Sequence, residues 1–458
     1  MISQAIQRVA PAVETVVKPS LGSIRLTPEA QHLQQLEIDY TVGGFTPLPG
    51  FFERGQGAKL WDINGREYLD FICMFSAGNQ GHCHPKIVAA MIEQMQKAYL
   101  INTSTHNTKW PVFAEMMCKR FGYDKISAMV TGAEAADLAC KIVRRHAHKV
   151  RGIPAEDVLV LAVSGSYHGL TGGVWNLQDP SPARTEYGLD SKQQTNVNPS
   201  TGELLRYGEI EDLEKCLEQH HDRVAAIIIE SIRNTGNTFE QEVKYARGVY
   251  DLCKKYGVLF IADEVRMGSG KTGKFFSFNH LGDDVKPDML VIGKSMTGGA
   301  YPASFVLGPE EIMTVVGPYE SGSTFAHTPL AIAAAEAAIR VLDEEHMVER
   351  AHAIGEKFTQ LTESLHDHPY VTGIEVRGAD FSITIKEDVA GKVTARRIGG
   401  LCLHKGLLLY PLEGRLRMSV TMVMTDEQLE QGVRIIKQAL DEVTSYDEIP
   451  GEKWHRSH

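Results

Sequence analysis

The chain lacks any apolar run long enough to cross a membrane. A spanning helix needs about 20 consecutive apolar residues, and polar or charged residues interrupt every apolar segment of this sequence. The first ten residues, Met1–Ala10, also lack the continuous apolar core of a secretory signal. One arginine and no acid before Glu14 give them a faint likeness to a mitochondrial presequence. We therefore expect a cytoplasmic protein, with a mitochondrial location as the weaker alternative.

Cysteine is scarce, and positive charge is not in excess. Seven cysteines lie scattered along 458 residues, an odd and dispersed set that is typical of reduced core residues rather than of a disulfide framework. The formal net charge of −11 argues against nucleic acid or an anionic membrane as a partner. A hydrophobic fraction of 43% gives enough material for one large domain and a smaller one.

Short apolar segments alternate with amphipathic ones through the middle of the chain. The pattern predicts strands at residues 158–164, 224–230, 258–263 and 289–293. It predicts helices at residues 84–99, 111–121, 134–150, 209–220 and 243–256. Short, nearly all-apolar strands between amphipathic helices indicate an α/β fold with a mostly parallel sheet covered on both faces.

The segments before and after this middle region have a different pattern, which predicts antiparallel strands. A hairpin is expected around the Asn64-Gly65 turn. A long helix at residues 329–346 leads into a C-terminal region, in which residues 373–377 and 381–385 alternate as antiparallel strands. That region closes with a helix at residues 426–441, for which Thr425 is the expected N-cap.

A lysine follows one of the apolar strands, and an aspartate ends another. Lys294 stands directly after the strand at 289–293 and before a glycine pair, and Asp263 ends the strand at 258–263. A lysine in such apolar surroundings is costly unless its amine has a chemical role. The two residues indicate a site for pyridoxal phosphate. Lys294 would hold this cofactor as a Schiff base, and Asp263 would keep its pyridine nitrogen protonated.

Two groups are candidates for holding the cofactor's phosphate. Gly132 and Ala133 expose backbone N–H groups at the positive end of the helix that follows them, which suits a phosphate dianion. Taken alone, this motif is equally an ordinary helix cap. Thr324, in Gly322-Ser323-Thr324, precedes the long helix at 329–346 and could donate to the same phosphate.

The remaining candidates follow the carboxyl ends of the expected strands, where ligands bind in open α/β sheets. Tyr167 and His168 follow the first strand, Glu230 ends the second, and Val265 lies just beyond Asp263. The Tyr167 ring could stack on a flat cofactor, although a turn aromatic that packs on the sheet edge is equally common. Each signal is weak alone, but their common order along one sheet edge favours a site.

Two further motifs are rejected as functional sites. The run Gly268-Ser269-Gly270-Lys271-Thr272 resembles a nucleotide-binding loop, but its first glycine is replaced by Val265 and no strand–loop–helix context surrounds it. The histidines of His82-Cys83-His84 are sequence neighbours, and Pro85 starts the next helix. We therefore expect no metal site there.

The motifs together resemble those of the class III, fold-type I pyridoxal-phosphate aminotransferases, and ornithine aminotransferases most of all. The likeness extends from about residue 60 to residue 440 and includes Asn79-Gln80-Gly81-His82, Thr131-Gly132-Ala133-Glu134, Ala262-Asp263-Glu264-Val265, Gly293-Lys294 and Gly322-Ser323-Thr324-Phe325. It implies a large domain at residues 71–330 with a mostly parallel, seven-stranded type of sheet. A smaller α+β domain would come from residues 1–70 and 331–445, followed by a loose tail at 446–458.

The resemblance also implies roles for the site residues. Lys294 would move the proton between substrate carbon and cofactor, and Thr324 would reach the phosphate of the partner subunit in a homodimer. Glu230 and Arg417 match a switchable ion pair that masks the arginine for an ω-amine or frees it for an α-carboxylate. The other expected cofactor contacts are Gly132, Ala133, Tyr167, His168, Asp263, Val265 and Arg266.

Four departures from the ornithine aminotransferase pattern bear on the substrate. Phe45 and Phe75 replace pocket tyrosines, which leaves a more apolar pocket. Leu170 stands where those enzymes carry the arginine for the distal carboxylate of 2-oxoglutarate, and leucine cannot pair with a carboxylate. Arg266 replaces a glutamine near the cofactor and could supply the missing positive charge.

Three functions are weighed. The first is an aminotransferase that acts on an amino acid or an ω-amine and passes the amino group to a keto acid or an aldehyde. The second is a racemase or epimerase of the same family, which needs no second substrate. The third is a non-catalytic homologue, against which the retention of both Lys294 and Asp263 argues, because an unused buried lysine and aspartate are costly.

Overall fold

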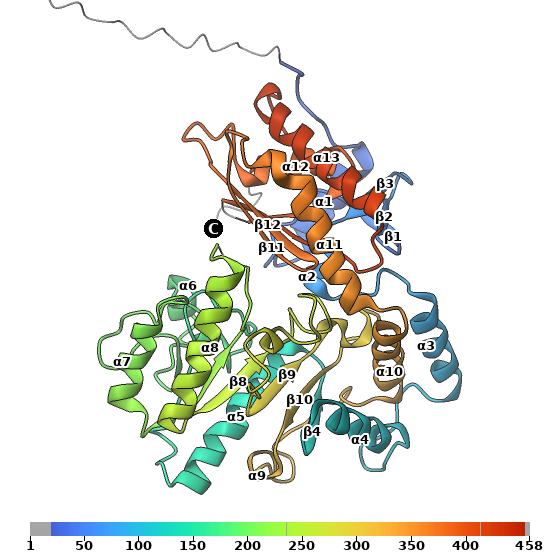
Figure 1. Ribbon diagram of the computed structural model, residues 1–458. Coiled ribbons are helices and arrows are strands. Elements are labelled where there is room, and N and C mark those ends of the chain that lie inside the picture. The colour runs from blue at the N-terminus through green and yellow to red at the C-terminus, as the bar shows by residue number, and fades with distance from the viewer. Residues whose placement is uncertain (1–19, 235, 413, 454–458) are drawn as a thin grey trace, which may run out of the picture.

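The computed structural model describes residues 20–234, 236–412 and 414–453 of the chain. The first ten residues, on which the expectation about a leader rests, lie outside these ranges, and so do the last five residues of the expected tail. Elements from both chain ends lie together in the upper part of Figure 1, above a larger body built from the middle of the chain.

A seven-stranded sheet runs through the larger body in the order β4-β10-β9-β8-β7-β5-β6. Its strands are β4 (Lys125–Met129), β5 (Leu159–Leu161), β6 (Gln194–Thr195), β7 (Val224–Ile229), β8 (Leu259–Asp263), β9 (Met289–Ile292) and β10 (Ser304–Gly308). The pairs among β6, β5, β7, β8 and β9 are parallel, whereas β10 is antiparallel to β4 and β9. The mostly parallel sheet is confirmed, although the sequence pattern did not predict β4, β6 or β10.

Helices cover both faces of this sheet, because its central strands carry apolar side chains on both faces. Ile227 and Ile229 of β7 belong to the cluster with α4 (Lys109–Phe121), α7 (Ile210–His220), α8 (Phe239–Tyr256) and α10 (Pro329–Glu344). Ala226 and Ile228 belong to the opposite cluster, with α5 (Gly132–Arg151). Alternate residues of a strand face opposite sides, so burial on both sides explains the all-apolar sequence of β7.

The smaller body holds two four-stranded sheets. The first has the order β1-β2-β3-β13 and contains β1 (Phe52–Gln56), β2 (Lys59–Asp62), β3 (Glu67–Asp70) and β13 (Leu407–Leu408). The second has the order β11-β12-β15-β14 and contains β11 (Val371–Arg377), β12 (Asp380–Ile385), β14 (Tyr410–Leu412) and β15 (Arg415–Ser419). The expected hairpin forms between β2 and β3, and β13 pairs parallel with β3, so both chain ends share one sheet.

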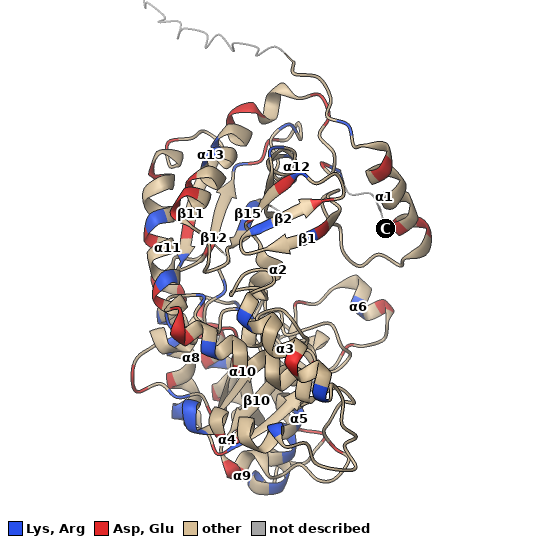
Figure 2. Ribbon diagram, turned by 90° about the vertical axis from the view of Figure 1, so that its right-hand side faces the viewer, with Lys and Arg blue, Asp and Glu red and all other residues tan. Residues whose placement is uncertain are grey.

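Helices α11 (Met347–Thr362), α12 (Ala395–His404) and α13 (Asp426–Glu442) share the core of this smaller body. Thr425 caps α13 as expected, since its side chain accepts the N–H of Gln428. Helices α3 (Pro85–Lys97) and α10 pack against each other in the larger body (Figure 2). The other helices are α1 (Pro28–Tyr40), α2 (Cys73–Ser76), α6 (Pro182–Glu186) and α9 (Glu310–Met313), with short 3-10 helices η1 (Trp175–Leu177), η2 (Ser277–His280), η3 (Lys294–Thr297), η4 (Glu363–Leu365) and η5 (Val443–Ser445).

No helix among the described residues is both long enough and apolar enough to span a bilayer.

Candidate active site

Lys294 lies at the carboxyl end of β9. The strand ends at Ile292, and after Gly293 the lysine opens η3 with a left-handed φ of 49°. Burial, followed by the nearby Arg266 guanidinium, lowers the pKa of the Lys294 amine. Its Nζ forms no hydrogen bond or ion pair with any residue that the structure describes. An amine with a lowered pKa and no protein partner is suited to act as a nucleophile.

Lys271 shows how a structural lysine differs from Lys294. Its side chain is fully buried, and its Nζ donates a hydrogen bond to the carbonyl oxygen of Val420 at 2.6 Å. Burial lowers the pKa of Lys271 to about 8. Because this amine is held by the backbone of the smaller body, the glycine-rich run around it serves packing.

Asp263 ends β8 as a buried carboxylate. One oxygen lies 2.6 Å from Nδ1 of His168, and the other accepts the N–H of Val265 at 3.0 Å. The neighbouring Glu264 serves another purpose, since its oxygens accept hydrogen bonds from Ser277, and burial raises its pKa to about 7. A buried aspartate backed by a histidine is the arrangement needed to keep a pyridine nitrogen protonated.

The loop that carries Tyr167 is held in place by Arg233, a residue that the sequence pattern did not indicate. Arg233 is buried and donates to the carbonyl oxygens of Ser164 at 2.6 Å and of Gly165. The N–H of Tyr167 donates to Glu230 at 3.1 Å. These contacts hold the Tyr167 ring near the end of β5, which is where a ring that stacks on a cofactor is expected.

The N-terminus of α5 has two unpartnered N–H groups. A capping box between Thr131 and Glu134 satisfies the N–H groups of both residues. The N–H groups of Gly132 and Ala133 donate to no described residue. Val265 lies so close that a Cβ at Gly132 would be 2.7 Å from its Cγ1. Two free donors at a helix N-terminus fit a phosphate dianion, so the residues present fit pyridoxal phosphate.

Arg417 lies on the face of the smaller body's sheet that carries Ser382 and Tyr410. In the strand register it lies directly opposite Ser382 of β12 and Tyr410 of β14, and residues directly opposite each other share one face of the sheet. Nearby Arg266 and then burial lower the pKa of Arg417 to about 10. No described carboxylate lies within ion-pair distance of its guanidinium, so the expected pair with Glu230 is not formed in this structure.

Arg266 connects the two bodies. It follows β8, and its guanidinium donates to Asp380 of β12 at 2.5 Å and to the carbonyl oxygen of Arg233 at 3.2 Å. The Asp380 carboxylate is fully buried and also accepts Nδ2 of Asn234 at 2.7 Å. The positive charge of Arg266 is therefore already paired, and Asp380 is a residue that the sequence did not reveal.

Phe75 is held against the site by a left-handed turn. Residues Cys73–Ser76 have φ values of 47°, 46°, 54° and 71°, a conformation that costs about 1–2 kcal/mol per residue. The Oδ1 atom of Asp70 accepts the N–H of Cys73 at 2.8 Å, and Ser76 bonds Ser419 at 2.8 Å. The Phe75 ring meets the Tyr410 ring edge-on at 4.9 Å, so a pair of aromatic side chains lies beside Arg417.

Three predicted residues stand apart from this arrangement. Phe45 is 76% exposed between α1 and β1, and Thr324 lies in an exposed turn before α10. Neither forms a hydrogen bond, ion pair or ring contact with another predicted site residue in the described chain. Leu170 is 53% exposed in the loop after His168. The single chain therefore brings together the cofactor side of the site more completely than its outer wall.

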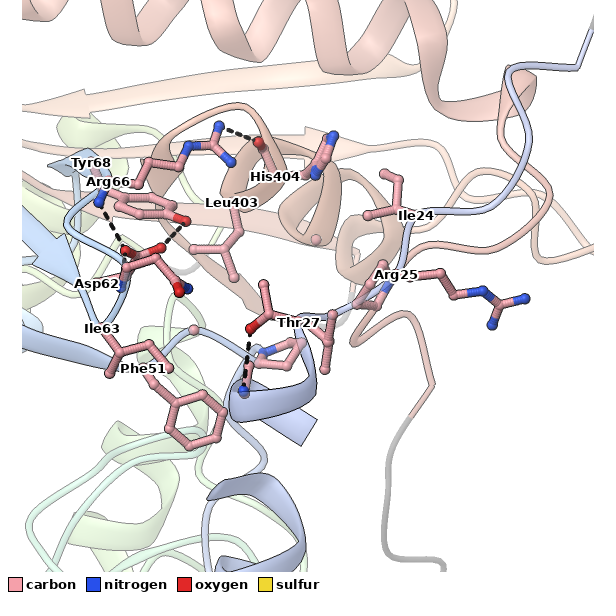
Figure 3. A pocket seen from close by; sticks show the side chains of 17 residues that line it. Ile24, Arg25, Thr27, Phe51, Asp62, Ile63, Arg66, Tyr68, Leu403 and His404 are labelled. Carbon is pink, nitrogen blue, oxygen red and sulfur yellow. Dashed lines mark hydrogen bonds between the residues drawn. The ribbon is translucent and has the colours of Figure 1, made fainter. Parts of the chain in front are cut away.

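A separate cavity of about 260 Å³ lies between α1, the β2–β3 hairpin and α12 (Figure 3). Asp62 accepts the hydroxyl of Tyr68 at 3.0 Å, and Arg66 donates to the carbonyl oxygen of His404 at 2.5 Å along its wall. None of the predicted site residues lines it, so it is distinct from the site at Lys294.

Similarity to known proteins agrees with this geometry. The family model for aminotransferase class-III matches residues 43–440. An ornithine aminotransferase of Schizosaccharomyces pombe is 38% identical over 93% of this chain and 96% of its own. The mitochondrial ornithine aminotransferase of Rattus norvegicus is 33% identical over 90% of this chain and 91% of its own.

Two solved structures show the same fold. Plasmodium falciparum ornithine delta-aminotransferase has a TM-score of 0.78 at 31% identity and covers 91% of this chain and 99% of its own. Acetylornithine aminotransferase from Elizabethkingia anophelis has a TM-score of 0.78 at 32% identity and covers 91% of this chain and 100% of its own. These likenesses confirm the fold-type I expectation and give no support to a racemase. The chain belongs to the class III aminotransferases and is an enzyme that transfers amino groups with pyridoxal phosphate.

Proposed function

We propose that the amino donor is an α-amino acid whose carboxylate binds Arg417, and that the acceptor is a monocarboxylic keto acid or an aldehyde. The observation that carries the proposal is the state of Arg417, which faces the site without a described carboxylate partner. An ω-amine donor would instead call for an arginine masked by Glu230. Glu230 here accepts the N–H of Tyr167, and that arrangement favours an open arginine.

In this proposal each residue around the cofactor has a separate role. The bound cofactor supplies the electron sink. Lys294 would attach the cofactor and would carry the proton to and from the substrate carbon, for which its lowered pKa is suited. Asp263, backed by His168, keeps the ring nitrogen charged. Gly132 and Ala133 would hold the phosphate, and Tyr167 and Val265 would contact the ring.

The acceptor half of the proposal rests on missing positive charge. Leu170 offers no cation for a second carboxylate, and Arg266 is already paired with Asp380. The distal carboxylate of 2-oxoglutarate would therefore enter without a partner, which is unfavourable wherever water is excluded. Pyruvate-like keto acids and aldehydes carry no such group.

The donor is tested by the half-reaction. The yellow holoenzyme is mixed with single amino acids, and loss of its absorbance band reports transfer of the amino group. We expect apolar α-amino acids such as leucine to bleach the band, and their amine analogues without a carboxylate, such as 3-methylbutylamine, to bleach it more slowly. Equal rates for the acid and the amine would contradict a role for Arg417.

We also propose a homodimer in which Thr324 serves the partner's phosphate site. The exposed position of Thr324 in its own chain supports this arrangement. Complementation tests it: Lys294→Ala and Thr324→Ala chains are co-refolded, and a mixed dimer regains one intact site only if Thr324 acts across the interface. Activity that stays at the sum of the two separate variants would exclude sharing.

For the compartment we propose the cytoplasm. All seven cysteines are free thiols, which supports a reducing compartment. Relatives that are described as mitochondrial exist, among them the rat enzyme. Fractionation of cells that express the full chain distinguishes the two locations, and recovery with the mitochondria would overturn the proposal.

A further inference from the structure

Two guanidinium groups and one buried carboxylate lie together where the two bodies meet. Asp380 and Ser382 are two residues apart on β12, and both bond Asn234, so they share one face of the sheet. Arg417 is directly opposite Ser382 on β15. It is therefore the diagonal cross-strand neighbour of Asp380, at a spacing of about 7–8 Å that a long side chain can bridge.

The carboxylate of Asp380 is nevertheless taken by Arg266. Arg266 comes from the other body, and its donor atom lies 2.5 Å from Oδ2 of Asp380, with side-chain exposures of 11% and 0% for the two partners. Asn234 donates to the other oxygen of the same carboxylate. Both oxygens are thus occupied by groups of the larger body, and Arg417, with no described ion-pair partner, remains open.

We propose that Arg266 is a specificity-determining residue: by occupying Asp380, it prevents Arg417 from pairing across the sheet and keeps it available for the carboxylate of an α-amino acid. This inference rests on the proposed function and adds how the receiving arginine is kept open. The wall beside Arg417, formed by Phe75 and Tyr410, favours a substrate side chain that is apolar or aromatic.

Electrostatics agrees with a competition between the two arginines. The Arg266 charge is the largest influence that lowers the pKa of Arg417, whereas Asp380 raises it. The two guanidiniums repel each other, and the single carboxylate attracts both. Removal of Arg266 leaves a buried, unpaired Asp380 next to an unpaired Arg417, and formation of a new pair between them relieves both costs.

A double-mutant cycle separates this competition from a general effect of charge. The variants are R266Q, D380N and R266Q/D380N, with R266K as the matched control that keeps the charge. The ligand is 4-methylpentanoate, which carries the carboxylate and an apolar chain but no amine. Its dissociation constant for each holoenzyme is measured by calorimetry, so the readout does not depend on turnover.

Competition predicts a non-additive cycle. R266Q should weaken binding about tenfold or more, because Arg417 pairs with Asp380, and R266K should stay within about threefold of the parent. D380N alone should change binding by less than about threefold, whereas in the R266Q background it should restore most of the loss. A uniform charge effect predicts instead that D380N tightens binding equally in both backgrounds, and that result would overturn the inference.

Two further measurements keep the test decisive if D380N fails to fold. The R266Q and R266K variants leave Asp380 intact, and equal affinities for the two would refute the inference. A crystal structure of R266Q should show Arg417 within about 4 Å of Asp380, and a wider separation would also refute it. If instead the cycle behaves as expected but no amino acid bleaches the parent, the competition for Asp380 holds and the assignment of an α-amino acid as the donor fails.

Discussion

Replacement of Asp263 by asparagine should slow amino-group transfer far more than it weakens cofactor binding. Asparagine has nearly the same size and still offers an oxygen to the N–H of Val265. It cannot balance the charge of a protonated ring nitrogen. Two opposite unit charges about 4 Å apart attract by about 4 kcal/mol at an effective dielectric constant of about 20. Since each 1.36 kcal/mol of barrier is about tenfold in rate, we expect a loss of about a thousandfold.

The assay compares the single-turnover rate of the half-reaction with the dissociation constant of the cofactor. The constant should rise by less than about tenfold, because the N–H groups of α5 that receive the phosphate are untouched. Glu264→Gln is the matched control: it removes the adjacent buried carboxylate, which bonds Ser277 and not His168. A rate for Asp263→Asn within about tenfold of the parent would refute the role of Asp263.

Three further predictions follow from single residues. Leu170→Arg should raise kcat/KM for 2-oxoglutarate relative to pyruvate by about fivefold, because a half-exposed ion pair contributes about 1 kcal/mol; a parent that already prefers 2-oxoglutarate would contradict the reasoning. Burial raises the pKa of Glu264 to about 7, so the folded protein binds this proton more tightly than the unfolded chain does. The resulting contribution to the free energy of unfolding is complete below the pKa of Glu264 in the unfolded chain and is lost as the pH rises through 7. Denaturant unfolding between pH 5 and 8 should show this fall in the free energy of unfolding, and Glu264→Gln should flatten it; equal slopes for both proteins would exclude Glu264 as the cause. Arg233→Met should weaken cofactor binding by freeing the loop of Tyr167, and an unchanged titration of the yellow band would show that the loop needs no such clamp.

The cofactor side of the site could be predicted because the rules that place it are local. Lys294 and Asp263 each follow a short apolar strand, and the carboxyl ends of neighbouring parallel strands meet at one sheet edge. Gly132 and Ala133 open a helix with a capping signature, which is also readable along the chain. These positions needed no knowledge of contacts between distant segments.

The substrate side depends on long-range pairing, so its contacts could not be derived from the sequence, although Phe75 and Arg417 were among the predicted residues. Asp380 meets Arg266 only because β12 and the end of β8 lie in different bodies that touch. Tyr410 joins Arg417 through the register of β14 with β15, and two-residue or three-residue strands give almost no periodicity to read. The prediction that Arg266 replaces the missing arginine at Leu170 overlooked a carboxylate that lies 114 residues away along the chain.

The most direct test of the account is the identity of the lysine that carries the cofactor. The yellow enzyme is reduced with borohydride, digested, and mapped by mass spectrometry. The added cofactor mass should lie on the peptide that contains Lys294 and should be absent in Lys294→Ala. Lys271 is the informative alternative. Burial lowers its pKa as well, but its amine donates a hydrogen bond to the carbonyl oxygen of Val420. A label on Lys271, or on any lysine other than Lys294, would contradict the site described above.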